Sequence, residues 1–385
     1  MNKRIEHLLK HNLLIQKLYS FFFSSFFRII GVFIRTDDHL VLLNSFGGKG
    51  FNDSPKVLFE YMLNDRRFAE MKYVWAFEHP DLFSIPNCKK VNINSFAYFF
   101  TALKSKYWIT NVNIERGLHF KKRKTRYLNT WHGTGPKVGG NAVTGRKDYD
   151  FSRVDVLCAD GDYLKSILIR DYKGLSENIV LFGRPREDEL YNMKLTEIEK
   201  WKRDLRIPEN KKIILYAPTW RESNDLGNSY SLDIPVHMNE WRSRLQEKYV
   251  ILFRAHNITN SVTGIIFDDF CINVSDYPNI NHLYAISDIL ISDYSSVFLD
   301  YAILEKPIIC YAYDYQKYCK ERGLYYDMEI VFPGGVLKTE NEVIDRIIKM
   351  DFLEEKKKTI EYRNRFIARE SNATEKCLIK LFNLE

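Results

Sequence analysis

The sequence predicts an α/β protein with two doubly wound halves, each built around a largely parallel sheet. From His39 onward, short runs of β-branched and aromatic residues alternate with longer amphipathic or polar segments, which is typical of βαβ units. These runs form two series, separated by a charged stretch over residues 187–211. The chain also has 385 residues, which is more than a domain with a single hydrophobic core usually contains.

The first series contains six expected strands and the second contains four. They cover residues 40–44, 73–77, 107–110, 127–130, 154–158 and 179–182, and then 213–216, 250–254, 289–292 and 308–311. We place the boundary near residue 195, which gives an N-terminal domain over 36–195 and a C-terminal domain over 196–385. Ligands bind at the carboxyl ends of strands in such sheets, so we expect function in the crevice between the halves.

Composition excludes several classes of protein and of site. With 45% hydrophobic and 28% charged residues, 18 Gly and 11 Pro, the chain is neither fibrous, low in complexity nor largely disordered. Its six cysteines are scattered, without a C-x-x-C pair or a Cys/His cluster. This spacing argues against a disulfide framework and against structural zinc, and it favours a reducing cytoplasm.

The basic residues are concentrated in two places. Of the net charge of +7, the first 35 residues contribute +5 and residues 121–126 contribute another +5, so the remainder is about −3. A nucleic-acid-binding protein usually carries its basic residues along the recognition surface of the fold. Two isolated patches instead favour an anionic membrane surface as partner, with no nucleic acid.

Residues 1–35 are predicted to be an amphipathic segment that associates with the membrane. The apolar run over 18–34 is only 17 residues long and contains Arg28, which is marginal for a span. On a helix, the polar residues fall on one narrow strip: Lys3, Lys10, Lys17, Ser24, Arg28 and Arg35. We expect the helix to lie in the bilayer interface with its cations at the headgroups. A true span and packing against the body remain alternatives, and the basic residues place the remaining chain on the cytoplasmic side.

The first candidate site lies in residues 127–140, where an expected strand runs into a glycine-rich loop. His132 follows that strand, and its unperturbed pKa near neutrality makes it the natural general base. Glycines such as Gly133 and Gly135 allow a ligand to approach the backbone. The alternative is a histidine that caps a turn.

Arginines follow the strand expected at 179–182. Arg184 and Arg186 could each bind phosphate, or they could pair with Glu187 and Asp188 as an interdomain clasp. The residues alone leave both possibilities open.

Two further polar clusters follow strands of the second series. Thr219 and Arg221 make a plausible anion site, although Thr219 could instead cap a helix. Arg254 and His256 are two residues apart, so at a strand end they project to one side and can converge on one phosphate. A buried core histidine is the alternative for His256.

Residues 289–314 read as a strand, a polar loop, a helix of about two turns and a second strand. Ser295 and Ser296 fall at the start of the helix, where hydroxyl and backbone N–H groups can hold an anion. Asp293 would repel phosphate, so we expect it to orient a neighbour or bind a hydroxyl. The sequence contains neither a P-loop motif nor a G-x-G-x-x-G after the first strand.

The order of these motifs resembles the CDP-glycerol glycerophosphotransferases, which prime and polymerise wall teichoic acids and related phosphopolyol capsules. The matching segments are W-H-G-T at 131–134, G-R-P-R at 183–186, Y-A-P-T-W-R at 216–221, R-A-H at 254–256, S-D-Y-S-S-V-F-L-D-Y at 292–301, K-P-I-I at 306–309, Y-A-Y-D at 311–314 and P-G-G-V-L-K-T at 333–339. Residues 1–120 resemble the family only at the level of the fold.

The resemblance implies a GT-B-like glycosyltransferase architecture, with two Rossmann-like domains facing a central cleft. It implies peripheral attachment to the cytoplasmic side of the cell membrane. The implied reaction transfers a polyol phosphate from CDP-glycerol or CDP-ribitol to a hydroxyl of a lipid-linked glycan acceptor of the undecaprenyl type. CMP is released, and neither a metal nor another cofactor is implied. Such a reaction serves teichoic acid or capsule biosynthesis.

The resemblance also implies roles for individual residues. His132 would be the base that deprotonates the acceptor, and His256 would act at the donor pyrophosphate. The residues implied to contact substrate are Gly133, Thr134, Arg186, Thr219, Arg221, Arg254, Asp293, Ser295 and Ser296. Phosphoryl transfer depends mainly on alignment and on positive or N–H-rich surroundings, which agrees with this set.

Three positions depart from the family pattern. Gly135 stands where Pro commonly follows W-H-G-T, Asn257 replaces a Pro after R-x-H, and Arg184 replaces a residue that is commonly aromatic. These departures bear on which polyol the donor carries more than on the class of reaction. The alternatives are a nucleotide-sugar glycosyltransferase or epimerase, and a non-catalytic membrane scaffold that binds anionic polymer through residues 121–126.

Overall fold

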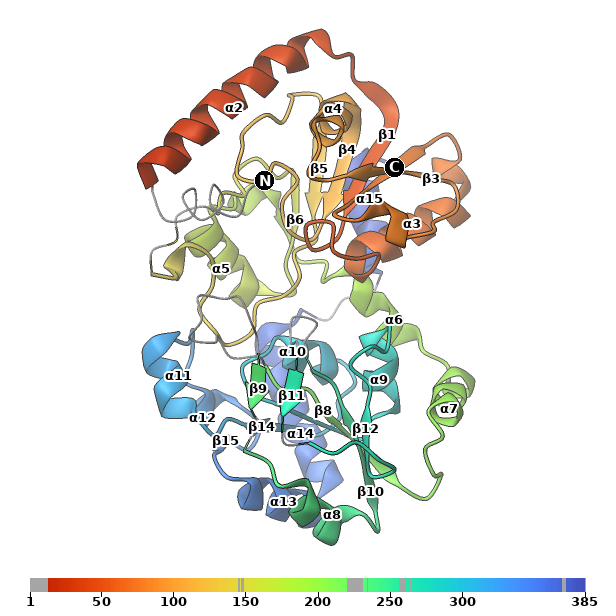
Figure 1. Ribbon diagram of the computed structural model, residues 1–385, viewed down its shortest axis with the longest axis vertical. Coiled ribbons are helices and arrows are strands. Elements are labelled where there is room, and N and C mark those ends of the chain that lie inside the picture. Colours follow the sequence, from red (N-terminus) through yellow and green to blue (C-terminus); the bar gives the residue numbers. More distant parts are fainter. Residues whose placement is uncertain are drawn as a thin grey trace. The chain divides into compact units, whose positions relative to one another are not determined.

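The computed structural model describes residues 13–144, 146, 149–219, 231–233, 235–255, 261–263, 265–368 and 372–384 (Figure 1). The chain divides into two compact units. The first contains the chain up to His132, Gly140–Asp188 and the residues from Ala368 onward, and the second contains Gly133–Gly139 and Glu189–Ile367. Each unit has its own parallel sheet.

The sheet of the first unit has the order β3-β2-β1-β4-β5-β6-β7 among the described residues, and all its neighbouring strands are parallel. Its strands are β1 (Asp37–Asn44), β2 (Lys72–Phe77), β3 (Cys88–Asn92), β4 (Ser105–Thr110), β5 (Arg126–Asn129), β6 (Val156–Cys158) and β7 (Ile179–Val180). All six strands expected in this half are confirmed within a few residues. The chain reverses its strand order between β1 and β4, the point where doubly wound sheets bind ligands.

The helices of the first unit are α2 (Leu13–Phe33), α3 (Asp53–Asn64), α4 (Phe96–Lys104), α5 (Asp162–Tyr172) and α15 (Ala373–Phe382), with α6 (Asp188–Asn192) at the boundary to the second unit. Short 3-10 helices cover η1 (Arg66–Phe68), η2 (Pro80–Leu82), η3 (Gly140–Ala142), η4 (Ser176–Asn178) and η5 (Pro185–Glu187).

The C-terminal helix corrects the expected domain division. We expected residues 196–385 to form one domain, but α15 packs with the first unit. Its apolar face, formed by Cys377, Leu378 and Leu381, is fully buried in the same core as Val41 and Leu128. The helix is amphipathic, so the sequence predicts that it packs on a core but not on which one.

The sheet of the second unit has the order β12-β10-β8-β13-β14-β15, again parallel throughout the described strands. The strands are β8 (Lys212–Tyr216), β10 (Tyr249–Phe253), β12 (Cys271–Asn273), β13 (Ile289–Ser292), β14 (Ile308–Tyr311) and β15 (Val336–Leu337), and β9 (Ser231–Asp233) pairs separately with β11 (Ser261–Thr263). All four strands expected in this half are confirmed.

Helices flank this second sheet. They are α7 (Leu195–Asp204), α8 (Met238–Leu245), α9 (Ile280–Ile286), α10 (Val297–Ala302), α11 (Tyr315–Glu321), α12 (Met328–Val331), α13 (Glu340–Ile348) and α14 (Phe352–Phe366). Side chains from β8, β10, β13 and β14 share a buried core with α8 and α13, which closes the sheet on that side.

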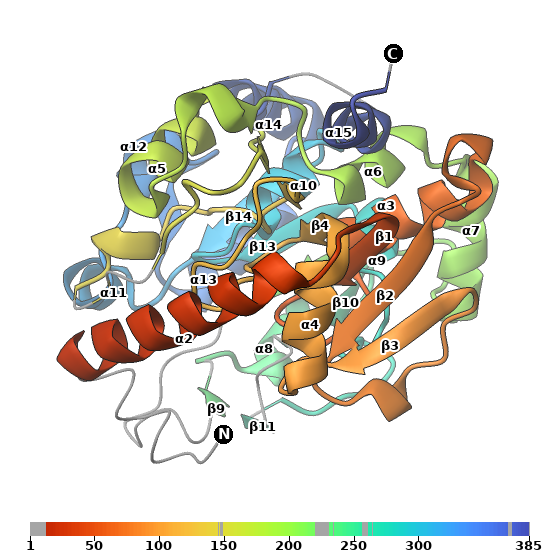
Figure 2. The ribbon, with the colours of Figure 1, turned by 90° about the horizontal axis from the view of Figure 1, so that it is seen from above.

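Helix α2 lies along the first unit beside α4, as Figure 2 shows. Phe27 is its main buried anchor, with 2% of its surface exposed, and its ring stacks on Phe99 at 4.4 Å between centroids. In the described part of the chain, no helix is long and apolar enough to cross a membrane.

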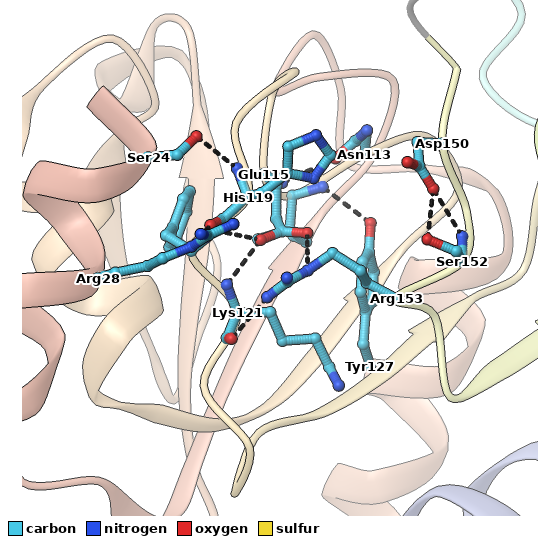
Figure 3. Close-up of polar contacts among 12 residues, drawn as sticks. Ser24, Arg28, Asn113, Glu115, His119, Lys121, Tyr127, Asp150, Ser152 and Arg153 are labelled. Atoms are coloured by element: carbon cyan, nitrogen blue, oxygen red, sulfur yellow. Dashed lines mark hydrogen bonds and ion pairs between the residues drawn. The ribbon is translucent and has the colours of Figure 1, made fainter. Parts of the chain in front are cut away.

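The polar side of α2 faces the first unit, which corrects one detail of the sequence prediction. We expected Ser24 and Arg28 to lie on a strip directed at lipid headgroups. Instead Ser24 is buried and its Oγ accepts the His119 N–H at 3.0 Å, while Arg28 Nε donates to the His119 carbonyl at 2.5 Å (Figure 3). Ser24 and Arg28 therefore satisfy backbone groups of the protein itself.

Glu115 holds the loop that receives α2. Its Oε1 accepts the N–H groups of Phe120 and Lys121, each at 2.6 Å, and its Oε2 pairs with Arg153 Nε at 3.1 Å (Figure 3). Burial raises the pKa of Glu115, although Arg153 and the two N–H groups oppose the shift. The carboxyl group therefore organises the backbone on which Ser24 and Arg28 dock.

Candidate active site

His132 follows β5 in a strained turn of the first unit. Trp131, directly before it, has a φ of 52°, a left-handed conformation that bulky residues rarely adopt. Phe46, whose ring centre lies 5.7 Å from the imidazole, also has a positive φ, of 46°. Strain of this kind persists where the surrounding structure enforces it, and it is concentrated at functional sites.

The tautomer of His132 suits a general base. Its Nδ1 lies 2.9 Å from the backbone carbonyl oxygen of Asn111. A carbonyl only accepts hydrogen bonds, so we assign the proton to Nδ1, which leaves a lone pair on Nε2. Burial lowers the pKa of His132 to about 4, and Asn111 and Asp53 only partly oppose this. The imidazole is therefore neutral at physiological pH and can accept a proton.

Arg186 lies close enough to influence His132 but has an acidic partner. Its Nη1 is 2.5 Å from Asp53 Oδ2, and its backbone N–H donates to Ser54 Oγ at 3.2 Å. The charge of Arg186 also contributes to lowering the pKa of His132. The structure thus places the charge of Arg186 near His132 in the first unit, with Asp53 as the acidic partner of Arg186.

Asn111 and Asp53 are the residues that sequence analysis missed here. Asn111 directly follows β4, and Asp53 follows the glycine-rich segment 47–50 that succeeds β1. Both therefore stand at carboxyl ends of strands, the criterion by which His132 was selected. A search of every strand end for polar residues would have found them.

Arg184 has a structural role. Its side chain is fully buried, with Nε 2.9 Å from Asp160 Oδ1 and a close ion pair to Glu187. Asp188 accepts the N–H groups of Ala373 and Thr374 at the start of α15. Of the two possibilities left open, ion pairing holds for Arg184, but these contacts lie within the first unit and form no interdomain clasp.

In the second unit, Asp293 fixes two adjacent loops. Its Oδ1 accepts the N–H of Thr219, after β8, at 2.9 Å and the N–H of Tyr294, after β13, at 2.8 Å. Ser292 adds a hydrogen bond from its Oγ to the Ala217 carbonyl at 2.6 Å. Asp293 therefore orients its neighbours, one of the two roles expected from the sequence, and Thr219 is placed beside the serine loop.

The glycine loop after His132 packs against these serines. A Cβ added to Gly135 would lie 2.8 Å from Ser296 N and 2.9 Å from Ser295 C, so only glycine fits there. Ser295 Oγ accepts the Val297 N–H at 3.3 Å at the start of α10, which has six residues. Thr134 is buried in the same loop. Gly133, Thr134, Ser295 and Ser296 thus belong to one part of the second unit.

The segment between α11 and α12 holds this loop in place. Lys137 pairs with Leu324 across an antiparallel bridge, the Val138 N–H donates to the Gly323 carbonyl, and the Pro136 carbonyl accepts the Tyr325 N–H at 2.7 Å. Backbone contacts of this kind restrict the loop strongly.

Arg254 follows β10, next to β8 in the sheet. Its Nη1 donates to the carbonyls of Val274 at 3.0 Å and Tyr277 at 2.8 Å, and burial lowers its pKa. Part of its guanidinium is therefore used to hold the loop after β12. His256 and Arg221 lie outside the described residues, so the expected convergence of Arg254 and His256 stays a prediction.

The two units offer complementary chemistry. The first presents a neutral imidazole with a basic Nε2, and the second presents hydroxyl, N–H and guanidinium groups at the carboxyl ends of β8, β10 and β13. Among the described residues there is no group of three or more His, Cys, Asp or Glu that could hold a metal ion. A neutral imidazole can accept a proton, and hydroxyl, N–H and guanidinium groups can bind phosphates.

Comparison with known proteins extends this picture. Residues 25–382 match the family model described as CDP-glycerol:poly(glycerophosphate) glycerophosphotransferase. The chain is 32% identical over 361 residues to the teichoic acid poly(glycerol phosphate) polymerase of Bacillus spizizenii, with 89% of this chain and 90% of that protein covered. It is 35% identical over 335 residues to the teichoic acid glycerol-phosphate transferase of Staphylococcus aureus, with coverage of 81% and 84%. It spans 43% of the longer polymerase of Staphylococcus epidermidis, to which it is 33% identical.

A solved structure shares the fold. The chain superposes on a variant of the wall teichoic acid polymerase TagF soaked with CDPG, with a TM-score of 0.79 and 27% identity. The superposition covers 94% of this chain and 92% of that one.

Proposed function

This chain belongs to the CDP-glycerol:poly(glycerophosphate) glycerophosphotransferase family, and we propose that it transfers glycerol phosphate from CDP-glycerol to a hydroxyl of a lipid-linked acceptor. The family expected from the sequence is confirmed, and with it the class of enzyme, a transferase of polyol phosphate from a CDP-polyol. Glycerol is the proposed polyol because the two relatives matched along most of their length carry glycerol phosphate in their names. Ribitol is the alternative, and a parallel reaction with CDP-ribitol tests it.

The observation that carries this proposal is the state of His132. Its Nδ1–H is directed to the Asn111 carbonyl, which leaves the lone pair on Nε2 to accept a proton, and its pKa of about 4 keeps the ring neutral before the reaction. In the proposed step, the acceptor hydroxyl gives its proton to Nε2 while its oxygen attacks the phosphorus that carries glycerol. The bond from that phosphorus to the bridging oxygen breaks, and CMP leaves with the bonding electrons.

The second unit is proposed to bind the donor. Thr219, Ser295 and Ser296 lie on loops that Asp293 and the 133–139 loop hold together, which would preorganise hydroxyl and N–H groups for the diphosphate. Arg254, with His256 and Arg221, is proposed to add positive charge. Gly133 and Thr134 would line the same site, and Arg186 would act in the first unit beside the base.

A substitution of His132 tests the assignment of the base. His132→Gln should reduce CMP release by about 100-fold or more, with little change in the KM for CDP-glycerol, because a general base contributes about 10² to 10⁴ in rate. His39→Gln, at an exposed histidine of the same unit, is the matched control and should retain full activity. Undiminished turnover by folded His132→Gln would exclude His132 as the base.

We also propose peripheral attachment to the cytoplasmic side of the cell membrane through the outward face of α2. Ser24 and Phe27 of α2 are buried against the protein, and apolar residues on the opposite side of the helix face outward, with Phe22 64%, Ile29 63% and Phe33 84% exposed. Residues 13–36 contain no Asp or Glu. An exposed apolar stripe of this length without acidic residues suits insertion into an anionic bilayer surface.

Neighbouring elements extend this surface. Phe96 and Phe100 of α4 are exposed, and the ring of Phe96 lies 6.5 Å from that of Phe27. Within the basic run 121–126, Lys121 pairs with Asp155 and Lys122 donates to the carbonyls of Ile34 and Leu103. The exposed members of the run that could meet anionic headgroups or an anionic acceptor are Arg123 and Lys124.

Vesicle binding tests this surface. The double substitution Phe22→Ser with Phe26→Ser should strongly reduce co-sedimentation with phosphatidylglycerol vesicles, since it removes apolar area that would enter the bilayer. Leu82→Ser is the control, because Leu82 is an even more exposed apolar residue, at 77%, on a different element of the same unit. Equal loss in both variants, or none in the double variant, would contradict the proposed orientation of α2.

A further inference from the structure

One segment of the second unit, residues 314–325, contacts both loops of the proposed donor site. It contains α11 and the residues that directly follow this helix. The two loops are the serine loop, residues 293–296 between β13 and α10, and the 133–139 loop, and all of these residues belong to the second unit. The Y-A-Y-D motif at 311–314 leads into the segment, but it contributes none of the proposed substrate-binding residues.

Asp314 accepts a hydrogen bond from the serine loop. The hydroxyl of Tyr294, a fully buried side chain, donates to Asp314 Oδ1 at 2.9 Å. Asp314 is also the Ncap residue of α11, where an Asp normally accepts an N–H of the first turn. Its side chain makes no such capping hydrogen bond. The carboxylate therefore binds the serine loop instead of capping its own helix.

Tyr318 of α11 fixes the ring of the same tyrosine. The two rings stack with 3.6 Å between their centroids and 5° between their planes. The backbone of Tyr294 is also fixed, because its N–H donates to Asp293 Oδ1 at 2.8 Å. Ser295 is the next residue in the chain. A residue that is held at its hydroxyl, ring and backbone restricts the positions open to its neighbour.

The other end of the segment holds the 133–139 loop. The N–H of Tyr325 donates to the Pro136 carbonyl at 2.7 Å, and its hydroxyl donates to the Gly139 carbonyl at 3.2 Å. The Gly323 carbonyl accepts the Val138 N–H at 3.1 Å. This loop in turn packs closely on the serine loop. One short segment therefore contacts both loops and restricts both of them.

We propose that Asp314 and Tyr318 are positioning residues that hold the serine loop, through Tyr294, in the arrangement that binds the donor diphosphate. Affinity for a diphosphate is higher when hydroxyl and N–H groups already point at the ligand, because ordering a loop during binding weakens it. The hydrogen bond and the ring stack order the loop before the donor binds. This inference rests on the proposed binding of a CDP-polyol at the serine loop.

A matched pair of tyrosine substitutions tests the inference. Tyr294→Phe removes only the hydroxyl that binds Asp314. We expect the Kd of CDP, measured by calorimetry, to rise about tenfold, the low end of what a hydrogen bond to a charged group contributes. The Kd of cytidine, which carries no phosphate, should not change. Tyr301→Phe is the control, because the buried Tyr301 hydroxyl donates to the Ser287 carbonyl at 3.1 Å, before β13 instead of after it.

Kinetics separate a positioning role from a general loss of structure. In CMP release from CDP-glycerol, Tyr294→Phe should raise the donor KM about tenfold and leave the acceptor KM unchanged, whereas Tyr301→Phe should change neither. If Tyr294 acts through the serines, Tyr294→Phe should have little further effect on CDP binding when Ser295 and Ser296 are both replaced by Ala. A fully additive effect would contradict this route.

CDP binding can be measured whether or not transfer occurs, so the inference and the proposed function can fail separately. Wild-type CDP affinity in folded Tyr294→Phe, or an equal loss of affinity for cytidine, would overturn the inference. A wild-type protein that binds CDP in a Tyr294-dependent way but releases no CMP from CDP-glycerol would overturn only the proposed reaction. If Tyr294→Phe fails to fold, Asp314→Ala removes the same hydrogen bond from its other end and carries the same expectations.

Discussion

Gly135→Ala is the change whose effect can be worked out most directly from the structure. The new methyl group would lie 2.8 Å from Ser296 N and 2.9 Å from Ser295 C, whereas ordinary contacts begin at 3.4 Å. The loop must therefore move by about 0.6 Å, and both atoms are backbone atoms that cannot swing away. A misplacement approaching 1 Å can cost about 100-fold in rate, so we expect kcat/KM for the donor to fall by about tenfold or more. Overpacking should also cost about 1 to 3 kcal/mol of stability.

The assay measures CMP release as a function of CDP-glycerol concentration, beside thermal unfolding of the same preparations. Gly117→Ala is the control, because Gly117 has a φ of 81° but no atom within 4 Å of an added Cβ. It should lose stability through backbone strain while its donor kinetics stay unchanged. Wild-type donor kinetics in folded Gly135→Ala would refute the claim that this loop and the serine loop form one donor site.

Three further predictions concern buried charges. Arg184→Met should destabilise the protein by about 3 to 5 kcal/mol in urea unfolding, because Asp160 and Glu187 would remain buried without a cation; a loss below 1 kcal/mol would contradict the structural role of Arg184. Lys306→Met should lower the free energy of unfolding by about 2 kcal/mol in the same assay, because the Lys306 ammonium donates to the carbonyls of residues 285 and 287. Unchanged stability would show that water satisfies these carbonyls equally well. The pKa of His132 is lowered from 6.5 to about 4, so the unfolded state binds more protons between these values, and up to about 3 kcal/mol of stability is lost as pH falls through that window. His132→Gln should remove that part of the pH dependence of thermal unfolding, and an identical pH dependence in both proteins would contradict it.

Much of the fold could be predicted because buried parallel strands are continuous apolar runs. All ten expected strands are present, including β13, where Ile289, Leu290 and Ile291 are fully buried. Strand β3 was missed because Cys88–Asn92 lies at the edge of its sheet and carries two lysines. An edge strand has only one paired side and needs no apolar run, so periodicity does not reveal it.

The site was predictable where one residue stands directly at a strand end. His132 and Asp293 were located in this way. The pairing of Arg184 with Glu187 was one of the expected possibilities. Its second partner, Asp160, and the partner of Arg186, Asp53, were not predicted, because they are tens to more than a hundred residues away in the sequence and only the sheet order brings them close. The sequence also could not predict which side of α2 packs against the protein. A polar strip can face either water or backbone groups that need a partner, such as those of His119.

The product of the reaction is the most direct test of the central claim. Purified protein would be incubated with CDP-glycerol and a lipid-linked acceptor, and CMP and the mass of the acceptor would be measured together, with CDP-ribitol in a parallel reaction. We predict one CMP for each glycerol phosphate added to the acceptor, little reaction with CDP-ribitol and none with His132→Gln. CMP formed without a gain in acceptor mass, or equal activity in His132→Gln, would contradict polyol-phosphate transfer by this site.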